Sequence, residues 1–139
     1  MKTIALVTCV SSKHNSPMPA GELYCSELFR KMSAYTKNNS DEWYILSAKY
    51  GLLSPKTVIA SYEKTLNRMS TIERREWSRK VLNDLKQVLS PGDQVIILAG
   101  IRYREHLMEP IRKMGCKVSV PMEGLRFGEQ LSWLNSHLE

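Results

Sequence analysis

The fold is decided by the stretch Ile45-Leu46-Ser47-Ala48-Lys49-Tyr50-Gly51-Leu52-Leu53. It continues a largely apolar segment, Glu42–Leu46, whose length and composition predict a buried strand. The strand ends on Ser47, Lys49 and Tyr50, which present a hydroxyl, an ammonium and a phenol before a turn at Gly51. In α/β proteins, ligand sites form beyond the ends of such strands, so this stretch predicts one wall of a site.

Three other segments have the composition of strands. Thr3–Val10 is a nearly continuous apolar run, which is typical of a strand buried on both faces of a parallel sheet. Asp93–Gly100 has the same character, whereas the alternation in Cys116–Pro121 favours an edge strand. The segment Leu52–Thr65 is expected to be irregular, with one short extended piece at Val58–Ile59.

In the segments between and after these strands, apolar residues recur at helical spacing. It predicts helices over Gly21–Asn39, from Ser70 to Ser90, over Tyr103–Met114, and from about Gln130 to Leu138. The second begins with a capping box, in which Ser70 and Glu73 satisfy each other's backbone N–H groups. We expect Pro110 to break or kink the third, because proline cannot donate the helical hydrogen bond.

Strands that alternate with helices indicate an α/β fold. We expect one domain over residues 1–139, built as a three-layer sandwich with a four-stranded, mainly parallel sheet and helices on both faces. Right-handed crossovers would bring the carboxyl ends of all four strands to one sheet edge. Four polar or glycine-containing segments would meet there: Cys9–Asn15, Ser47–Gly51, Ala99–Tyr103 and Glu123–Gln130.

The first of these segments is a candidate anion site. The hydroxyls of Ser11 and Ser12, the backbone N–H groups and the charge of Lys13 could hold a phosphate or carboxylate. The alternative is a surface loop rich in turn-forming residues. Cys9 could be a nucleophile if its pKa were lowered, although a cysteine at a strand end is more often a small buried side chain.

The second segment holds the other catalytic candidates, Lys49 and Ser47. Lys49 could bind an anion or, if desolvated, act as a base or Schiff-base amine. Tyr50, beside Gly51, could stack on a base or donate a hydrogen bond. Alternatively, Lys49 is solvated and Tyr50 packs on a helix. Tyr62, farther along, could equally cap a ligand or anchor its loop.

The remaining two segments supply ligand-binding candidates. Gly100 permits close approach of the backbone, and Tyr103 follows it. Gly124 and Gly128 precede Gln130, whose amide has the geometry to bind the edge of a base. Arg102 and Arg104 are interpreted as part of a solvated helix face.

Composition narrows the function classes. A hydrophobic fraction of 42% and a charged fraction of 24% are ordinary for a globular protein, and no apolar run reaches the about 20 residues of a membrane span. We expect a cytoplasmic protein without a membrane partner. Three cysteines and three histidines lack the spacing of disulfide or metal sites, so no metal or cofactor is expected. A net charge of +6 favours nucleotides or nucleic acid as partners.

Several blocks together resemble a known family. They are Cys9–Lys13, Glu22–Phe29, Tyr44–Leu53 and Gly124–Leu131, with Tyr62 between the last two. This combination, which covers nearly the whole chain, resembles the DUF6884 family of bacteria and their phages. It is more distantly similar to YaaA-like peroxide stress proteins and to a domain of archaeosine synthases. The resemblance implies a fold like that of uracil-DNA glycosylases and a setting of nucleic acid or modified bases. The glycosylase motifs themselves are missing, so that activity is not implied.

Three hypotheses follow. The first is an enzyme that processes a nucleotide, nucleoside or nucleobase in connection with nucleic acid, with N-glycosidic bond chemistry as one form. The second is a non-catalytic, basic protein that binds DNA, RNA or a nucleotide in a stress or phage-related response. The third is an interaction subunit that uses Trp133 on the last helix. The sequence does not indicate an oligomeric state.

Overall fold

A computed structural model describes residues 1–8, 18–20, 27–59 and 65–138 of the chain. Its main sheet has five strands in the order β4-β3-β1-β6-β7. They are β1 (Thr3–Thr8), β3 (Glu42–Ser47), β4 (Gly51–Leu53), β6 (Gln94–Leu98) and β7 (Lys117–Ser119). Four of them are parallel to their neighbours, and β4 alone is antiparallel, to β3. The mixed α/β class is confirmed, but the sheet has five strands where four were predicted.

The unpredicted strand β4 follows directly from the turn after β3. Gly51 has a φ of 76°, a left-handed value that glycine adopts without steric cost. The turn reverses the chain, so Ser47 pairs with Gly51 and Ile45 with Leu53. A three-residue strand is too short to show the alternation by which strands are recognised, and the sequence pattern therefore missed it.

A second small sheet joins β2 (Met18–Pro19) to β5 (Val58–Ile59) in antiparallel fashion. The extended piece at Val58–Ile59 was predicted and is confirmed. The partner strand was expected to be loop, because its prolines are typical of loops. Pro19 is nevertheless compatible with a two-strand ribbon, because an edge position leaves one side of each strand without ladder hydrogen bonds.

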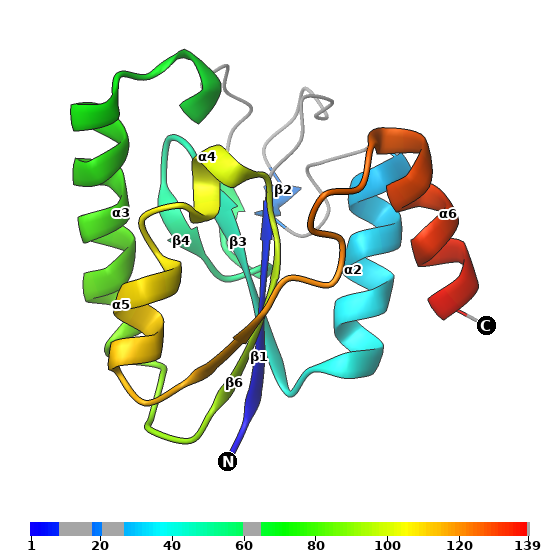
Figure 1. The fold of residues 1–139 in the computed structure, drawn as a ribbon, viewed down its shortest axis with the longest axis horizontal. Coiled ribbons are helices and arrows are strands. Elements are labelled where there is room, and N and C mark those ends of the chain that lie inside the picture. Colours follow the sequence, from blue (N-terminus) through cyan, green and yellow to red (C-terminus); the bar gives the residue numbers. More distant parts are fainter. Residues whose placement is uncertain (9–17, 21–26, 60–64, 139) are drawn as a thin grey trace.

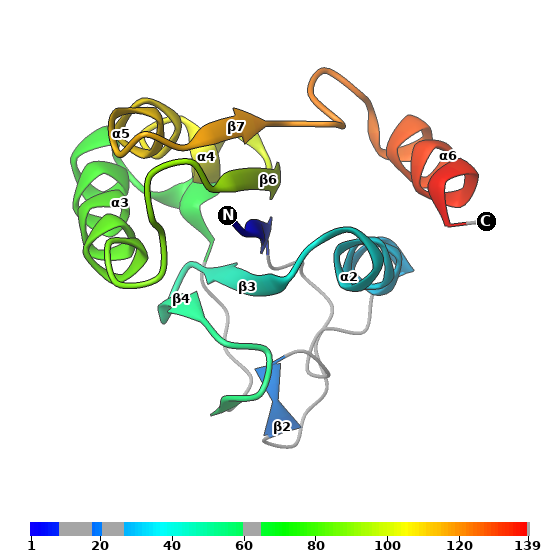
Figure 2. The ribbon, with the colours of Figure 1, turned by 90° about the horizontal axis from the view of Figure 1, so that it is seen from below.

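The helices lie on both sides of the main sheet (Figures 1 and 2). On one side are α3 (Thr71–Leu85), α4 (Ile101–Arg104) and α5 (Met108–Lys113). On the other side are α2 (Glu27–Asn39) and α6 (Phe127–His137), and a 3-10 turn, η1 (Leu66–Arg68), precedes α3.

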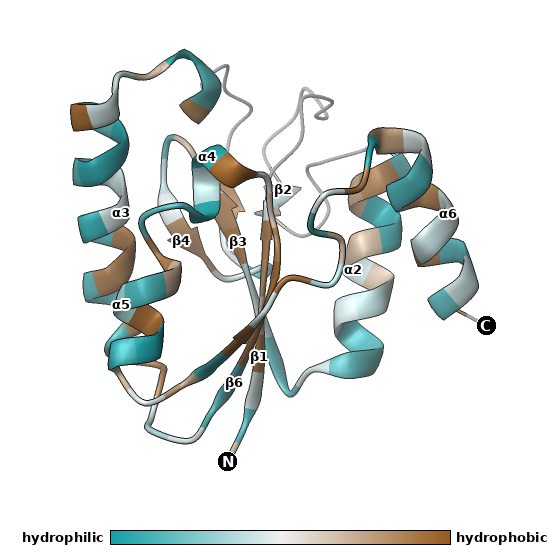
Figure 3. Ribbon diagram, viewed as in Figure 1, coloured by the Kyte–Doolittle hydropathy of each residue, from teal (hydrophilic) through white to brown (hydrophobic). Residues whose placement is uncertain are grey.

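The central strand β1 explains why one sheet supports two cores. Its residues Ile4 to Val7 are completely buried. Ile4 and Leu6 belong to the cluster on the α3 side, and Val7 belongs to the cluster on the α2 side. Figure 3 shows apolar residues along the central strands and a mixture of polar and apolar residues along the helices. The continuous apolar run of this strand is thus used on both faces, as predicted.

The helix start predicted at Ser70 is confirmed, whereas the break predicted at Pro110 lies elsewhere. The capping box is present: Ser70 Oγ accepts from the Glu73 N–H at 3.2 Å, and Glu73 Oε1 accepts from the Ser70 N–H at 3.0 Å. The helix predicted over Tyr103–Met114 is divided into α4 and α5, but the break comes before Pro110, not at it. Pro110 lies in the first turn of α5, where its missing N–H would have no helical partner.

Candidate functional site

Strand order places a topological switch point between β1 and β6. From β1 the chain crosses through α2 to β3 on one side, and from β3 it crosses through α3 to β6 on the other side. Crossovers that leave in opposite directions open a crevice beyond the carboxyl ends of these two central strands. Their register pairs Val7 with Leu98, so Thr8 and Ala99 are the first residues at the crevice.

A cavity of about 260 Å³ lies at this position. Its lining joins the ends of β1 and β6 to α2, α4, the segment after β7 and the start of α6 (Figure 1). The surface is mainly apolar, with a small number of polar groups, which is the usual composition of a small-molecule site. The lining residues are Thr8, Leu28, Met32, Ile97, Leu98, Ala99, Gly100, Ile101, Arg104, Val120, Met122, Gly124, Leu125 and Gln130.

Among the lining residues that the structure describes, Arg104 is the one with an ionisable side chain. Its Nη1 donates to the Ala99 carbonyl at 3.0 Å, which holds the guanidinium beside the end of β6. Its Nε is buried without a hydrogen-bond partner among the residues that the structure describes. A buried, unsatisfied N–H of a charged group is costly, so this arginine has more donor capacity than the protein uses.

Gln130 lines the cavity and also shapes its rim. Its side-chain Nε2 donates to the Leu125 carbonyl at 3.0 Å, and its backbone N–H donates to the Arg126 carbonyl at 2.8 Å. The amide therefore holds the segment after β7 against the start of α6. Gly124, in this segment, has a φ of 80°, so the turn requires a residue that tolerates left-handed backbone.

Of the predicted ligand-binding residues, Gly100, Gly124 and Gln130 meet at this cavity. Gly128 lies exposed in α6 and is not part of the lining. The predicted residues Cys9, Ser11, Ser12, Lys13 and Tyr62 lie outside the described part of the chain. Thr8, which directly precedes Cys9, does line the cavity.

The segment after β3 is at the same sheet edge but does not line this cavity. Ser47 is completely buried, and its Oγ accepts from the Tyr50 N–H at 3.1 Å, which shapes the turn. Lys49 is exposed, with Nζ 5.2 Å from the centre of the Tyr50 ring. Tyr50 is half-buried against the cluster on the α2 side. The exposed Lys49 and the packed Tyr50 agree with the alternative stated above for this segment, in which the lysine is solvated and the tyrosine packs against the protein.

Tyr103 is likewise directed away from the cavity. It is buried, and its ring packs edge-to-face on Trp77 with the ring centres 5.7 Å apart. Its hydroxyl oxygen lies 3.5 Å from both the Leu66 N and Thr65 Oγ1, at the limit of hydrogen bonding. Tyr103 therefore joins α4 to the η1 turn and to α3.

Sequence reasoning missed Arg104. The interpretation of Arg102 and Arg104 as a solvated face holds for Arg102, which is exposed, but is wrong for Arg104. A usable signal was present, because Ile101 and Arg104 are three residues apart in a helix that starts directly after β6. Residues at that spacing share a helix face, and Ile101 also lines the cavity while remaining 55% exposed.

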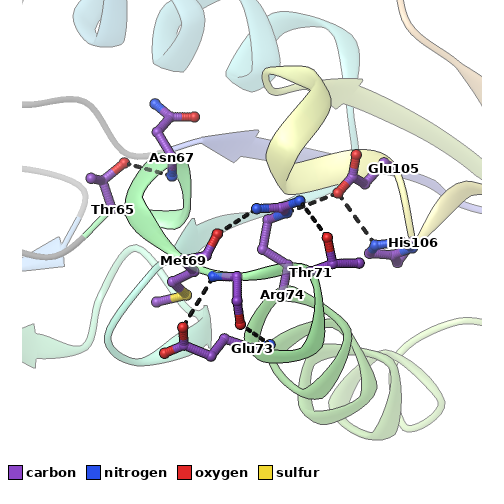
Figure 4. Close-up of polar contacts among 9 residues, drawn as sticks. Thr65, Asn67, Met69, Thr71, Glu73, Arg74, Glu105 and His106 are labelled. Carbon is purple, nitrogen blue, oxygen red and sulfur yellow. Dashed lines mark hydrogen bonds and ion pairs between the residues drawn. The ribbon is translucent and has the colours of Figure 1, made fainter.

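A partly buried ion-pair network joins α3 to Glu105 and His106, the residues that follow α4 (Figure 4). Arg74 of α3 is 7% exposed, and its Nε donates to Glu105 Oε1 at 2.9 Å. The other guanidinium nitrogens donate to the Met69 carbonyl and to Thr71 Oγ1. His106 Nε2 lies 3.3 Å from the same Glu105 oxygen. Since Glu105 follows Arg104 in the chain, this network fixes the position of the cavity's arginine.

We expect Gly51→Ala to lower the free energy of unfolding by about 1–2 kcal/mol, since an L-residue is strained at its positive φ. The new Cβ would meet Lys80 Cε at 3.6 Å, an ordinary contact, so the cost is conformational. Gly128→Ala is the matched control: it lies in α6 with open space around it, and should raise stability by up to about 1 kcal/mol. Urea unfolding of both variants measures this difference, and equal effects would contradict it.

Two absences are found in the part of the chain that the structure describes. No group of three His, Cys, Asp or Glu side chains is close enough to hold a metal ion. No helix is both long and apolar enough to cross a membrane.

Comparison with known proteins gives a family without an assigned activity. Residues 4–136 match a family described as a family of unknown function, DUF6884. The chain is 28% identical over 153 residues to the uncharacterized protein YfjM of Bacillus subtilis (strain 168), an alignment that covers 100% of this chain and 97% of the relative. No solved structure matches the chain significantly. Because the family match spans nearly the whole sequence, the chain belongs to the DUF6884 family.

Proposed function

We propose that this protein is an enzyme that processes a nucleotide, nucleoside or nucleobase in connection with nucleic acid, and that its ligand binds in the cavity between β1 and β6. The single observation that carries the proposal is this cavity, which lies at the switch point of a mainly parallel sheet. In open α/β sheets, ligands bind in the crevice at this point.

The size and lining of the cavity favour one base as the occupant. Its volume of about 260 Å³ is just below the about 300–1,000 Å³ of pockets that bury drug-sized molecules. Apolar side chains such as Met32, Leu98 and Met122 offer a surface for a flat ring. The Gln130 amide offers polar contacts for a base edge or sugar, and the Arg104 guanidinium adds a positive charge for an anionic group on the ligand.

Part of this proposal rests on resemblance. We propose that the helices and sheet form a three-layer sandwich related to YaaA-like proteins and to uracil-DNA glycosylases. We also propose that the reaction is cleavage or transfer at an N-glycosidic bond. Fold-level similarity supports the ligand class more strongly than the reaction, because one fold serves many reactions.

Binding is tested by calorimetric titration of nucleobases, nucleosides and nucleotides. We expect at least one to bind the wild-type protein, and Leu125→Trp to abolish binding because the larger side chain occupies the cavity. Leu138→Trp is the control, since Leu138 is partly exposed at the end of α6 and is not a lining residue. Binding that survives Leu125→Trp, or no binding by any compound, would contradict the proposed site.

Catalysis is tested separately, by incubating the protein with labelled nucleotides and DNA and separating the products. Among the catalytic candidates that the structure describes, Lys49 is exposed and follows β3, and the proposal assigns it the catalytic role. We expect turnover to be lost in Lys49→Ala and retained in Lys56→Ala, an exposed lysine in the next loop. If ligands bind but none is converted, the protein is not an enzyme for these compounds.

That outcome would favour a second candidate function, non-catalytic binding of nucleic acid or nucleotides. The observation that favours it is the net charge of +6. Binding driven by phosphate contacts weakens steeply with salt, so the logarithm of the affinity for DNA should fall linearly with the logarithm of the salt concentration. Salt-independent affinity, or no affinity, would count against this candidate.

A further inference from the structure

We propose that the ligand of the cavity is a base that carries one phosphate, and that the Arg104 guanidinium binds that phosphate. This inference rests on the proposed function and narrows its ligand class from nucleobases, nucleosides and nucleotides to nucleoside monophosphates. The phosphate could belong to a free mononucleotide or to a nucleotide within a strand. Both sources present the same chemistry to the cavity.

The charge of Arg104 favours an anionic ligand. Arg104 brings a positive charge to the cavity, and no carboxylate is present among the described lining residues. Its neighbour Glu105 does not neutralise it, because that carboxylate is bound by Arg74 Nε at 2.9 Å. Within the described chain, Arg104 has no ion-pair partner at all. An arginine at a mainly apolar cavity whose described lining has no carboxylate favours a ligand that supplies the negative charge.

The hydrogen-bond donors of Arg104 favour a phosphate as the anionic group. A guanidinium has five N–H donors in a planar fork, and the described contacts of Arg104 use one, from Nη1 to the Ala99 carbonyl at 3.0 Å. That bond fixes the orientation of the fork beside the cavity. The Nε is enclosed by protein without a partner, so the remaining Nη donors are the ones that can reach a ligand. A phosphate matches such a fork through two parallel hydrogen bonds.

The volume of the cavity favours a ligand with one base and one phosphate. A cavity of about 260 Å³ is too small for a dinucleotide and suits one base with a short extension. Triphosphates are usually bound with Mg²⁺ held by carboxylates, and the described lining residues include none. A single phosphate on one arginine is therefore the anion that these residues suit best.

The experiment compares matched pairs by calorimetry on the full chain: adenosine with AMP, guanosine with GMP, cytidine with CMP and thymidine with TMP. We expect the monophosphate to bind about tenfold more tightly than its nucleoside for at least one base, the effect of one charge-assisted contact. Arg104→Gln should reduce the affinity for the monophosphate to that for the nucleoside. The affinity for the nucleoside itself should change little, because glutamine retains bulk and a donor.

Two further variants control for folding and for general charge. Arg104→Lys keeps the charge but loses the fork, and should give an intermediate affinity for the monophosphate. Arg112→Gln removes an exposed arginine that is paired with Glu109, and should leave both affinities unchanged. Thermal unfolding of each variant by circular dichroism shows whether it is folded at the temperature of the titration.

The outcomes separate this inference from the function on which it rests. If nucleosides bind as tightly as monophosphates, or if Arg104→Gln binds monophosphates as the wild type does, the inference is overturned and the proposed function stands. If no member of the panel binds, the inference is overturned, and if the free nucleobases also fail to bind, the proposed function is overturned with it. A 5′-phosphorylated oligonucleotide forms the second arm: tighter binding than the mononucleotide, sensitive to Arg104→Gln, places the phosphate in a strand, and weaker binding identifies the free nucleotide.

Discussion

Replacing Trp77 with alanine is expected to lower the free energy of unfolding by about 4 kcal/mol and the melting temperature by about 10 °C. Trp77 is 7% exposed in the cluster on the α3 side, so its removal leaves a large cavity there. Its Nε1 also donates to the Ser47 carbonyl at 2.9 Å, which joins α3 to the end of β3. The measurement is urea and thermal unfolding of the variant beside the wild type.

Trp77→Phe separates the two contributions. Phenylalanine keeps the edge-to-face contact with Tyr103 and most of the buried area but cannot donate to Ser47. We expect a smaller loss, about 1–2 kcal/mol, for the hydrogen bond and the lost ring. As a control, Ile72→Ala in the same helix should change stability by less than about 0.5 kcal/mol, because Ile72 is 72% exposed. A Trp77→Ala variant as stable as Ile72→Ala would contradict the packing seen here.

Replacing Arg74 with methionine is expected to cost about 3 kcal/mol, the lower end of the range for removing one partner of a buried ion pair. The lower end applies because the Glu105 side chain is 24% exposed and keeps some hydration. Methionine preserves the apolar stem, so the loss reports the polar contacts with Glu105, Met69 and Thr71. Arg75→Met is the matched control, since Arg75 is exposed on the same helix and should have little effect.

The same pair predicts a pH dependence. Burial alone raises the pKa of Glu105, but the hydrogen bond from Arg74 and the positive charges around it hold that pKa below its ordinary value. A carboxyl whose pKa is lowered by folding contributes stability above the ordinary value of about 4.3, and this stability is lost as the pH falls through the lower folded value. The stability difference between wild type and Arg74→Met should therefore narrow in acid. A constant difference down to about pH 2 would contradict this linkage.

The Arg74 variant also tests whether the network positions the cavity. Because Glu105 follows Arg104, loosening α4 should weaken binding of a monophosphate more than binding of its nucleoside. A purely structural role would weaken both equally at a temperature where the variant is folded. This comparison uses the same titrations as the Arg104 variants and adds no new ligand.

Elements whose signal is local were predicted correctly. The continuous apolar run of β1 and the strand at β6 are buried as expected, and the Ser70 capping box is present. The family resemblance to DUF6884 was also visible in the sequence, and its match over residues 4–136 agrees. The apolar runs and the capping box depend on neighbours within a few residues, and such neighbours are read directly from the chain.

The cavity lies beyond the carboxyl ends of β1 and β6, and it brings together some of the predicted site residues but not others. Gly100, Gly124 and Gln130 line the cavity. Ser47 and Tyr103 are buried elsewhere: Ser47 Oγ accepts from the Tyr50 N–H, and the Tyr103 ring packs on Trp77. Ser47 and Tyr103 have the same residue types whether they bind a ligand or hold two elements together. Their tertiary neighbour Trp77, which donates to the Ser47 carbonyl and packs on the Tyr103 ring, is visible only in the fold.

By itself, the sequence determined the α/β class, the central buried strands and the helix start at Ser70. Tertiary structure decided the strand order, the antiparallel strand β4 and the placement of Arg104 at the cavity. The physical reason is the separation along the chain of the residues that determine each feature. Burial and capping are encoded by residues close in the chain, whereas strand order and the direction of a side chain depend on which helix packs on which face, and that packing is a property of the whole fold.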